Sequence, residues 1–416
     1  MKVISFLGPV NYSATKYVYT TSDGERKTYA TTYFTEAIAH FFPQVDQVLV
    51  FATPRVKVHP NLLALEQRLG KKMRVVEIPE GRNKNEIWRI FDSLISEVDP
   101  QDEVVFDITG SLRSLPFISF LAAAFLRAAR GVKVKAVLYG AFEARDQDSH
   151  ETPVFDLSSF MQMLDWINAT NQFVYTGNGA YLAKLISDQG KMQHIQSLGS
   201  AGKRLREFSQ AMMLCRPLEI LASADKLGQV LDRAEPDLQQ WAKPYALLSE
   251  RINQEYASLS VPEPTAEDYI QDSLRSQFRL LVWYLEHNQV LQGVTLAREW
   301  LVTAVGWRLD KGFLLDTEAR RSVERALSGL CRLGKKNEDG TIFTESCLNN
   351  DGKLLVLWSE CEKLKSIYTE LMLIRNDLDH AGMNKDQIPA DTLNHKLKKS
   401  ILPGLRNIAI MWRLKD

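Results

Sequence analysis

Residues 375–380 read Arg-Asn-Asp-Leu-Asp-His and combine a permanent cation with a titratable imidazole near the end of a strongly helical segment. An imidazole transfers protons near neutral pH, and a guanidinium holds a phosphate through two parallel hydrogen bonds. These are the parts needed to cut RNA without a metal ion. Arg145 and His150 have the same spacing, and a pattern this loose arises about once by chance in a chain of this length. The surrounding elements must therefore decide between the two.

The first third of the chain alternates short apolar runs with helical stretches. The runs with the composition of buried strands are 3–7, 47–52, 74–78, 104–109 and 132–142. The helical stretches between them are 33–42, 62–69, 86–98 and 115–129. Continuous apolar strands separated by helices indicate a parallel sheet covered on both faces. We therefore predict a doubly wound, Rossmann-like α/β domain over residues 1–155, with the apolar helix 115–129 buried against the sheet.

Beyond residue 156 the strand pattern fades and helical periodicity takes over. The predicted helical stretches are 160–171, 201–216, 218–231, 238–255, 266–307, 317–333 and 354–378. A Val-Pro-Glu-Pro-Thr segment at 261–265 has the composition of a linker. We therefore predict an all-α connector over residues 156–264 and an all-α C-terminal domain over 265–416. We expect the following tryptophans to be core aromatics and not base-stacking platforms, because each buries a large apolar area: Trp283, Trp300, Trp307, Trp358 and Trp412.

The composition limits the classes of partner. Lys+Arg and Asp+Glu are balanced at 51 each, so a nucleic-acid site must be local, and we expect no DNA partner. The four cysteines are scattered without CxxC or zinc-like spacing, which indicates reduced thiols and no metal site. The N-terminus reads as a strand and not as a signal peptide, and no apolar run reaches the ~20 residues that span a bilayer. We expect a soluble, cytoplasmic protein.

Two loops of the α/β domain have the chemistry of a ligand site. Residues 8–15 follow the first strand, and residues 107–114 link the fourth strand to a helix that has Pro116 in its first turn. Ligands of doubly wound sheets bind at such carboxyl ends, and small residues there let backbone amides approach a phosphate. A capped turn, with Ser114 as N-cap and Gly110 for conformation, explains the second loop equally well. The chain has no GxxxxGK[ST] or GxGxxG motif, so NTPase and dehydrogenase functions are set aside.

Both loops resemble those of CARF domains, the sensors of type III CRISPR-associated proteins. The similar segments are Ser-Phe-Leu-Gly at 5–8 with Tyr12, Asp-Ile-Thr-Gly-Ser-Leu-Arg-Ser at 107–114, and Leu-Tyr-Gly-Ala-Phe-Glu at 138–143. Relatives often carry His where this chain has Gly110. The resemblance implies a homodimer that binds a cyclic oligoadenylate, with tetra-adenylate the expected ring. The ligand-binding residues that it implies are Gly8, Asn11, Tyr12, Thr15, Asp107, Thr109, Gly110, Ser111, Arg113 and Ser114.

The C-terminal half resembles the HEPN ribonuclease domain that follows CARF domains in this family. Arg375, Asn376 and His380 match its Arg-Asn-then-His signature, and Ala-Gly follows the His as in relatives. Arg145 and His150 lie in a polar loop of the α/β domain and are treated as a chance match. The resemblance implies an accessory antiviral endoribonuclease that cleaves single-stranded RNA without a metal or other cofactor and leaves 2′,3′-cyclic phosphates.

The spacing within the motif leaves the assignment open. Residues four apart share a helix face, so Asn376 faces the same way as His380, whereas Arg375 pairs with Asp379. A surface ion pair with His380 at a helix C-terminus would give the same residues. We therefore interpret Arg375 and His380 as half a site that a second copy completes. Glu299, on another helix, is a candidate for positioning Arg375, and a solvated ion pair explains it equally well.

Two other functions fit the same residues. The sensor cleft itself could cleave its cyclic activator, with Thr109, Ser111 and Arg113 placing a phosphodiester, although neither loop holds a histidine. Alternatively, the chain is a ligand-sensing regulator without catalysis. Neutral charge and the lack of a clear recognition helix argue against DNA as the target of such a regulator.

Overall fold

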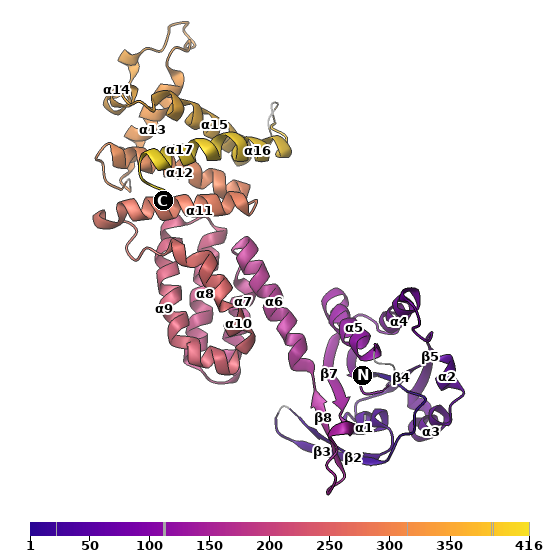
Figure 1. Cartoon of the computed structure of the whole chain (residues 1–416). Helices are drawn as coiled ribbons and strands as arrows, with labels where there is room; N and C mark the ends of the chain where they lie inside the picture. The colour runs from indigo at the N-terminus through magenta and orange to yellow at the C-terminus, as the bar shows by residue number, and fades with distance from the viewer. Residues whose placement is uncertain (22, 111–113, 314, 384, 386, 416) are drawn as a thin grey trace. The chain divides into compact units, whose positions relative to one another are not determined.

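The computed structural model describes residues 1–21, 23–110, 114–313, 315–383, 385 and 387–415. The chain divides into two compact units, Met1–Leu164 and Asp165–Asp416, coloured indigo to magenta and magenta to yellow in Figure 1. The connector and the C-terminal helices thus pack together as one unit. The three domain boundaries predicted from the sequence remain a prediction.

The first unit is built on a sheet whose described strands run in the order β3-β2-β8-β7-β6-β1-β4-β5. The strands are β1 (Lys2–Phe6), β2 (Thr15–Thr20), β3 (Arg26–Thr31), β4 (Gln47–Ala52), β5 (Met73–Glu77), β6 (Glu103–Asp107), β7 (Lys133–Gly140) and β8 (Glu151–Asp156). β1 pairs in parallel with both β4 and β6, and β4–β5 and β6–β7 are parallel as well. These five strands are the ones predicted from the sequence, and the doubly wound α/β fold is confirmed.

Three strands were not predicted. β2 and β3 form an antiparallel hairpin, and β8 joins it to the sheet by pairing in parallel with β2 and antiparallel to β7. Their sequences alternate: in β2, Tyr17 and Tyr19 are buried while Lys16 and Thr20 are exposed. One face of these strands is solvated, so they lack the continuous apolar run that marks a strand covered on both faces.

Helices cover both faces of the sheet. The helices of this unit are α1 (Phe34–Phe41), α2 (Pro54–Lys57), α3 (Pro60–Leu69), α4 (Lys84–Ser96) and α5 (Leu115–Arg130), with short 3-10 turns at Gly70–Lys72 and Phe142–Ala144. Val3 packs with the core under α1 and α3, and its neighbour Ile4 packs with the core under α4 and α5. Successive strand residues point to opposite faces, so a strand covered twice must be apolar throughout. Burying one such side chain stabilises the fold by about 1.5–3 kcal/mol.

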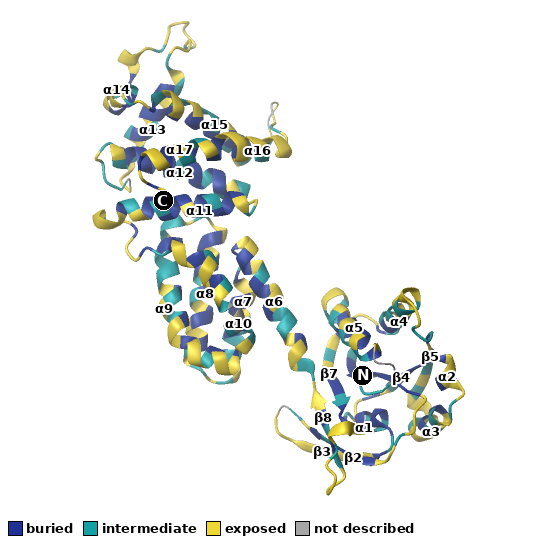
Figure 2. Ribbon diagram, in the orientation of Figure 1, coloured by how far each residue is buried: buried dark blue, intermediate teal, exposed yellow. Residues whose placement is uncertain are grey.

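The helix predicted over 115–129 packs against the sheet as expected, but only one of its apolar faces is buried. On α5, Leu115, Ala122 and Leu126 pack on the sheet, whereas Phe117, Leu121 and Phe125 are 67%, 45% and 44% exposed. These three residues are four apart and form one stripe along the helix, which we call the α5 stripe. Figure 2 shows the contrast between buried strands and exposed outer helix surfaces. No helix in the described ranges is long and apolar enough to cross a membrane.

The described residues of the second unit form helices joined by loops, with an isolated β-bridge between Lys336 and Ile342. Its helices are α6 (Ser158–Thr176, which begins in the first unit), α7 (Ala180–Met192), α8 (Gln196–Met213), α9 (Pro217–Trp241), α10 (Lys243–Tyr256), α11 (Ile270–Glu286), α12 (Val290–Arg308), α13 (Thr317–Arg332), α14 (Asn350–Val356), α15 (Cys361–Asp379), α16 (Ala390–Lys396), the π-helix Leu397–Ile401 and α17 (Leu402–Met411). Short 3-10 turns lie at Ala257–Leu259, Glu267–Tyr269 and Glu345–Cys347.

The core of this unit centres on α12. Trp300 is fully buried against Phe278, at 5.0 Å between ring centroids, and its indole Nε1 donates to the carbonyl of Leu274 at 2.9 Å. Trp283 and Trp412 are buried as well, as predicted, whereas Trp307 and Trp358 are only partly buried. The helix predicted over 266–307 is instead two helices, α11 and α12, because Asn288 adopts a left-handed conformation between them (φ 58°). A single left-handed residue ends a helix and redirects the chain.

Candidate functional site

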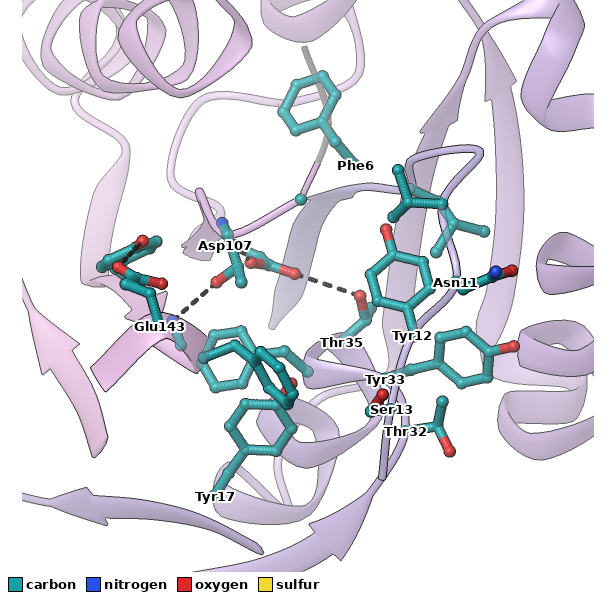
Figure 3. Close-up of a pocket in the computed structure, with 18 residues that line it drawn as sticks. Phe6, Asn11, Tyr12, Ser13, Tyr17, Thr32, Tyr33, Thr35, Asp107 and Glu143 are labelled. Atoms are coloured by element: carbon teal, nitrogen blue, oxygen red, sulfur yellow. Dashed lines mark hydrogen bonds between the residues drawn. The ribbon is translucent and has the colours of Figure 1, made fainter. Parts of the chain in front are cut away.

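A cavity of about 230 Å³ opens at the carboxyl ends of β1, β6 and β7 (Figure 3). This is the edge at which doubly wound sheets bind ligands. It is lined by Phe6, Leu7, Val10, Asn11, Tyr12, Ser13, Tyr17, Thr32, Tyr33, Phe34, Thr35, Asp107, Thr109, Gly110, Tyr139, Gly140, Phe142 and Glu143. The lining is aromatic and polar, and it contains no lysine or arginine among the described residues.

Asp107 ties the strand ends together on one side of the cavity. Its carboxylate accepts hydrogen bonds from Ser5 Oγ at 2.6 Å, Thr35 Oγ1 at 3.2 Å and the Thr109 backbone N–H at 2.9 Å. Thr109 Oγ1 in turn accepts from the Gly140 N–H at 2.8 Å. Burial raises the pKa of Asp107, and the hydrogen bonds from Ser5, Thr109 and Thr35 oppose that shift. The network holds β1, β6, β7 and α1 in register around the cavity.

The opposite wall is aromatic. The Tyr12 and Tyr33 rings meet edge to face, with centroids 5.5 Å apart. The Tyr12 hydroxyl accepts the Gly8 N–H at 2.8 Å, and burial raises the pKa of Tyr12. Asn61 Nδ2 donates to the Val10 carbonyl at 2.7 Å and fixes the loop from α3. Such a wall presents flat rings and few competing charges, which suits stacking of a planar base.

Glu143 is a lining residue to which the sequence analysis gave no role. It follows β7, and its carboxylate accepts a hydrogen bond from the Tyr139 hydroxyl. Burial and this carboxylate together raise the pKa of Tyr139 to about 12. Its position just after a parallel strand was the available signal, but a charged loop residue has no pattern that separates it from a solvated one. A carboxylate here can accept a hydrogen bond from an amino group of a ligand.

The structure brings together half of the residues that the resemblance implied for ligand binding. Those that line the cavity are Asn11, Tyr12, Asp107, Thr109 and Gly110. Gly8 is not part of the lining, but its backbone N–H donates to the hydroxyl of Tyr12, which is. Thr15 lies in β2 and turns to the neighbouring strand, where its hydroxyl bonds the His150 carbonyl at 3.0 Å and Thr152 Oγ1 at 2.7 Å. Ser114 is exposed at the N-cap of α5 without a capping hydrogen bond from its side chain. Ser111 and Arg113 lie outside the described residues.

Gly110 fills a position with no room for a side chain. A Cβ there would lie 2.7 Å from the Phe6 carbonyl oxygen and 3.4 Å from the Tyr12 hydroxyl. The first atom belongs to the backbone of β1, so it cannot move aside without shifting the strand. The loop of this chain therefore approaches β1 more closely than a loop with His at that position could.

The second candidate site is the end of α15. Arg375 pairs with Asp379 at 3.3 Å, as the spacing predicted, and His380 is the exposed C-cap residue. No hydrogen bond joins Arg375 to His380, both of which are described. Ala381 and Gly382 are both left-handed (φ 52° and 68°) and turn the chain away from the helix.

A groove of about 330 Å³ runs beside this helix end. It is lined by Glu370, Leu373, Ile374, Asn376, Asp377, Ile388 and Lys396. Asn376 and Lys396 bring an amide and a cation to it, whereas Arg375 and His380 lie outside the lining. Asp377 is only 5% exposed and accepts the Ile388 N–H at 3.3 Å, so it holds the segment after the motif against α15. Within one chain, Asn376 thus lines a groove that neither Arg375 nor His380 lines.

Glu299 contacts other residues than Arg375. It forms ion pairs with Arg298 at 2.5 Å and with Arg320, and Glu324 pairs with both arginines at 3.0 and 3.3 Å. Burial lowers the pKa of Arg320. This network links α12 to α13 and gives Glu299 a structural role.

The side chains of Arg145 and His150, the chance match, are in direct contact, whereas those of Arg375 and His380 are not hydrogen-bonded to each other. Arg145 Nη2 lies 2.6 Å from His150 Nδ1 in the exposed connection between β7 and β8, and its guanidinium lies over the Phe142 ring. Neither residue lines a described cavity. Within the described ranges, no cluster of three or more His, Cys, Asp or Glu side chains is arranged to hold a metal ion.

Comparison with known proteins gives the chain relatives. Residues 162–260 match the family described as CRISPR-associated protein MJ1674, second domain. CRISPR-associated protein MJ1674 of Methanocaldococcus jannaschii is 31% identical over 193 residues, which cover 44% of this chain and 29% of that relative. The match thus spans less than a third of the relative's length. The solved structure of Enterococcus italicus Csm6 bound to cyclic hexa-2′-fluoro-hexa-dAMP aligns over 99% of this chain and 94% of its own, with 10% identity and a TM-score of 0.44. Residues 162–260 of the chain are thus similar to the second domain of a CRISPR-associated protein.

Proposed function

We propose that this chain is an endoribonuclease switched on by a cyclic oligoadenylate. The observation that carries the proposal is the pairing of two sites in one chain: an aromatic, polar cavity in the α/β unit and an Arg-Asn-then-His motif at an exposed helix end in the helical unit. Kinship with CRISPR-associated proteins supports it. Its expected place of action is the cytoplasm, on single-stranded RNA.

The cavity suits an adenine nucleotide. The rings of Tyr12 and Tyr33 offer a face or edge to a base, and Glu143 offers an acceptor for an exocyclic amino group. Gly110 lines the cavity, and its backbone N–H is a donor for a phosphate oxygen. In a symmetric dimer each loop is used twice, which matches the symmetry of a cyclic ligand. Tetra-adenylate is the first ring to test.

The exposed α5 stripe supports a dimer. Phe117, Leu121 and Phe125 leave a continuous apolar strip on a helix that begins next to the cavity loop. Apolar residues at a spacing of four are able to pack against the same residues of a second copy, related by a two-fold axis. Contiguous exposed apolar surface of this kind marks interaction sites.

In catalysis His380 is the general base for the ribose 2′-hydroxyl or the acid for the leaving 5′-oxygen. Arg375 stabilises the charge that develops on the phosphate, and Asn376 orients His380 or the phosphate. One imidazole does not perform both proton transfers easily, so the second comes from the partner copy. The products carry 2′,3′-cyclic phosphates, and DNA resists because it lacks the 2′-hydroxyl. No cofactor is part of this scheme.

The direct test is cleavage of a fluorescent single-stranded RNA by the full chain, with and without cyclic tetra-adenylate or hexa-adenylate. We expect one ring to raise the rate by at least ten-fold and the products to end in 2′,3′-cyclic phosphates. An unchanged rate with both rings contradicts activation, and full activity of H380A contradicts the assignment of the site.

A further inference from the structure

A further groove is formed by residues that lie, in the sequence, between those of the two proposed sites. α7 and α8 pack side by side in the helical unit (Figure 1) and border a shallow groove of about 620 Å³. The groove is lined by Ser187, Gly190, Lys191, His194, Ile195, Gln196, Gly199, Lys203 and Arg206. It falls inside the segment that matches the second domain of the MJ1674 family, and it contains none of the residues of the other sites.

The two helices meet through glycines, so the floor of the groove is backbone. A Cβ on Gly190 would lie 2.9 Å from the Gly199 nitrogen, and a Cβ on Gly202 would lie 2.7 Å from the Ala183 carbonyl oxygen. Gly199, by contrast, has nothing within 4 Å of its Cβ position. The helices are in close contact at Gly190 and Gly202, whereas at Gly199 the backbone is open to a ligand.

A tight turn between the helices sets the two walls. His194 is left-handed (φ 56°), and the Ile195 N–H donates to the Gly190 carbonyl at 2.8 Å, so only three residues separate α7 from α8. Lys191 and His194 then stand at the α7 wall, and Lys203 and Arg206 stand at the α8 wall. Cationic side chains thus flank the floor on both sides.

The groove has a strong excess of positive charge. It presents three permanent cations and one imidazole, and no carboxylate is among its lining residues. Lys191 pairs loosely with Asp188 at 3.7 Å, where both side chains are exposed, and Lys203 and Arg206 have no ion pair with any residue that the structure describes. In a chain with 51 charges of each sign, such a local imbalance is not a by-product of composition.

We propose that this groove binds the phosphate backbone of single-stranded RNA outside the cleavage site. The choice of RNA as the ligand rests on the proposed ribonuclease function. Exposed cations gain little from one small anion, but each one that meets a phosphate of a polyanion releases condensed counterions. The groove holds no Phe, Tyr or Trp side chain, so it contacts the backbone without selecting bases. It lies in the same compact unit as Arg375, Asn376 and His380 and anchors long substrates there.

The test compares two charge reversals of equal size in the H380A background, which prevents cleavage. K203E/R206E removes the α8 wall, and K226E/R233E changes exposed residues of the neighbouring helix α9 by the same charge. Fluorescence anisotropy with a 30-nucleotide single-stranded RNA at 50 mM salt reads the affinity. We expect K203E/R206E to bind at least ten-fold more weakly and its log Kd–log salt slope to be smaller by about 1.4, at about 0.7 per lost phosphate contact. K226E/R233E should stay within two-fold of the parent.

Equal affinities of the two double variants would overturn the proposal. K203Q/R206Q, which removes charge without reversing it, should show a smaller loss in the same direction, and equal thermal unfolding of all variants excludes misfolding. With His380 restored, K203E/R206E should cleave a four-nucleotide RNA at the wild-type rate and a 30-nucleotide RNA more slowly. Loss of both activities would instead implicate the groove in folding and overturn the RNA-binding role. The binding measurement needs no cleavage, so it stays decisive even if the ribonuclease function fails.

Discussion

The cavity of the α/β unit and the end of α15 are organised in different ways. Around the cavity, Asp107, Thr109 and Tyr12 are joined to their neighbours by hydrogen bonds of 2.6–3.2 Å. At the end of α15, Arg375 pairs with Asp379, and His380 faces solvent. The residues of the cavity are thus connected to one another within one chain, whereas the three motif residues at the end of α15 are not. The proposed switch needs such a difference, because the ligand must favour the assembled state over the idle one.

Loss of His380 should have the largest effect and should separate the two regions. We expect H380A to reduce activator-dependent RNA cleavage by about 10²–10⁴-fold, the contribution typical of a general acid or base, and to leave activator affinity unchanged. Single-turnover cleavage and isothermal titration calorimetry measure the two quantities. H150A is the matched control, since His150 lies 2.6 Å from Arg145 at the same sequence spacing, and it should keep the wild-type rate. A large loss of cleavage activity in H150A would assign the catalytic step to the Arg145–His150 pair and not to His380.

Charge on the α5 stripe should break the link between the regions. F117D/F125D should shift the protein from dimer to monomer in sedimentation velocity and lower the cleavage rate by at least ten-fold at micromolar protein, because desolvating two carboxylates in an apolar contact is costly. L63D, which changes an equally exposed leucine on α3, is the control and should remain dimeric. A monomeric wild-type chain that cleaves RNA would mean that one copy holds the complete site.

Glu143 should influence only the cavity. If its carboxylate accepts from the adenine amino group, E143A should weaken activator binding by about ten-fold, the effect of one lost hydrogen bond to a charged acceptor. E143Q, which keeps an acceptor oxygen, should lose less. At saturating activator both variants should cleave at the wild-type rate. E66Q, at an exposed carboxylate of α3, controls for surface charge. A fall in the saturated rate of E143A would place Glu143 in signal transfer and not in base recognition.

Asp107 should give the smallest effect, on stability. Burial raises its pKa in the folded chain, so its contribution to stability is complete below the unfolded value and is lost as the pH rises through the folded value. The stability of the wild type relative to D107N should therefore fall as the pH rises above the unfolded pKa of about 4 and level off above the folded pKa. Calorimetric unfolding of the full chain across this range measures it. A difference that is constant with pH, or that grows, contradicts the direction of the shift.

The fold was predictable where the pattern and the burial agree. The five central strands carry continuous apolar runs because both faces are covered, and all five were identified. The hairpin β2–β3 and strand β8 alternate polar and apolar residues within a loop-like composition, so they were missed. For α5 the composition was read correctly, but the sequence does not distinguish a side chain covered by its own sheet from one left for a partner.

The candidate site was predictable at the level of loops and less so at the level of side chains. Position at the carboxyl ends of strands led to Asn11, Tyr12, Asp107 and Thr109. Thr15 belongs to β2, and the two-residue period of that strand turns it toward β8, which could not be foreseen without identifying the strand. Glu143 was quoted within a motif and given no role, since a carboxylate in a loop gives no periodic signal.

The buried position of Asp377 has a consequence for how genetic screens of this motif are interpreted. An alanine scan across residues 375–380 would find Asp377 as intolerant as His380, although its carboxylate holds Ile388 and the following segment to α15. Under the proposed function, selection would preserve three kinds of residue in these six positions. Arg375 and His380 would act on the phosphate or on protons, Asn376 would orient them, and Asp377 would keep the turn in place. An abundance readout beside the activity readout separates them, because only the D377A protein should disappear from cells.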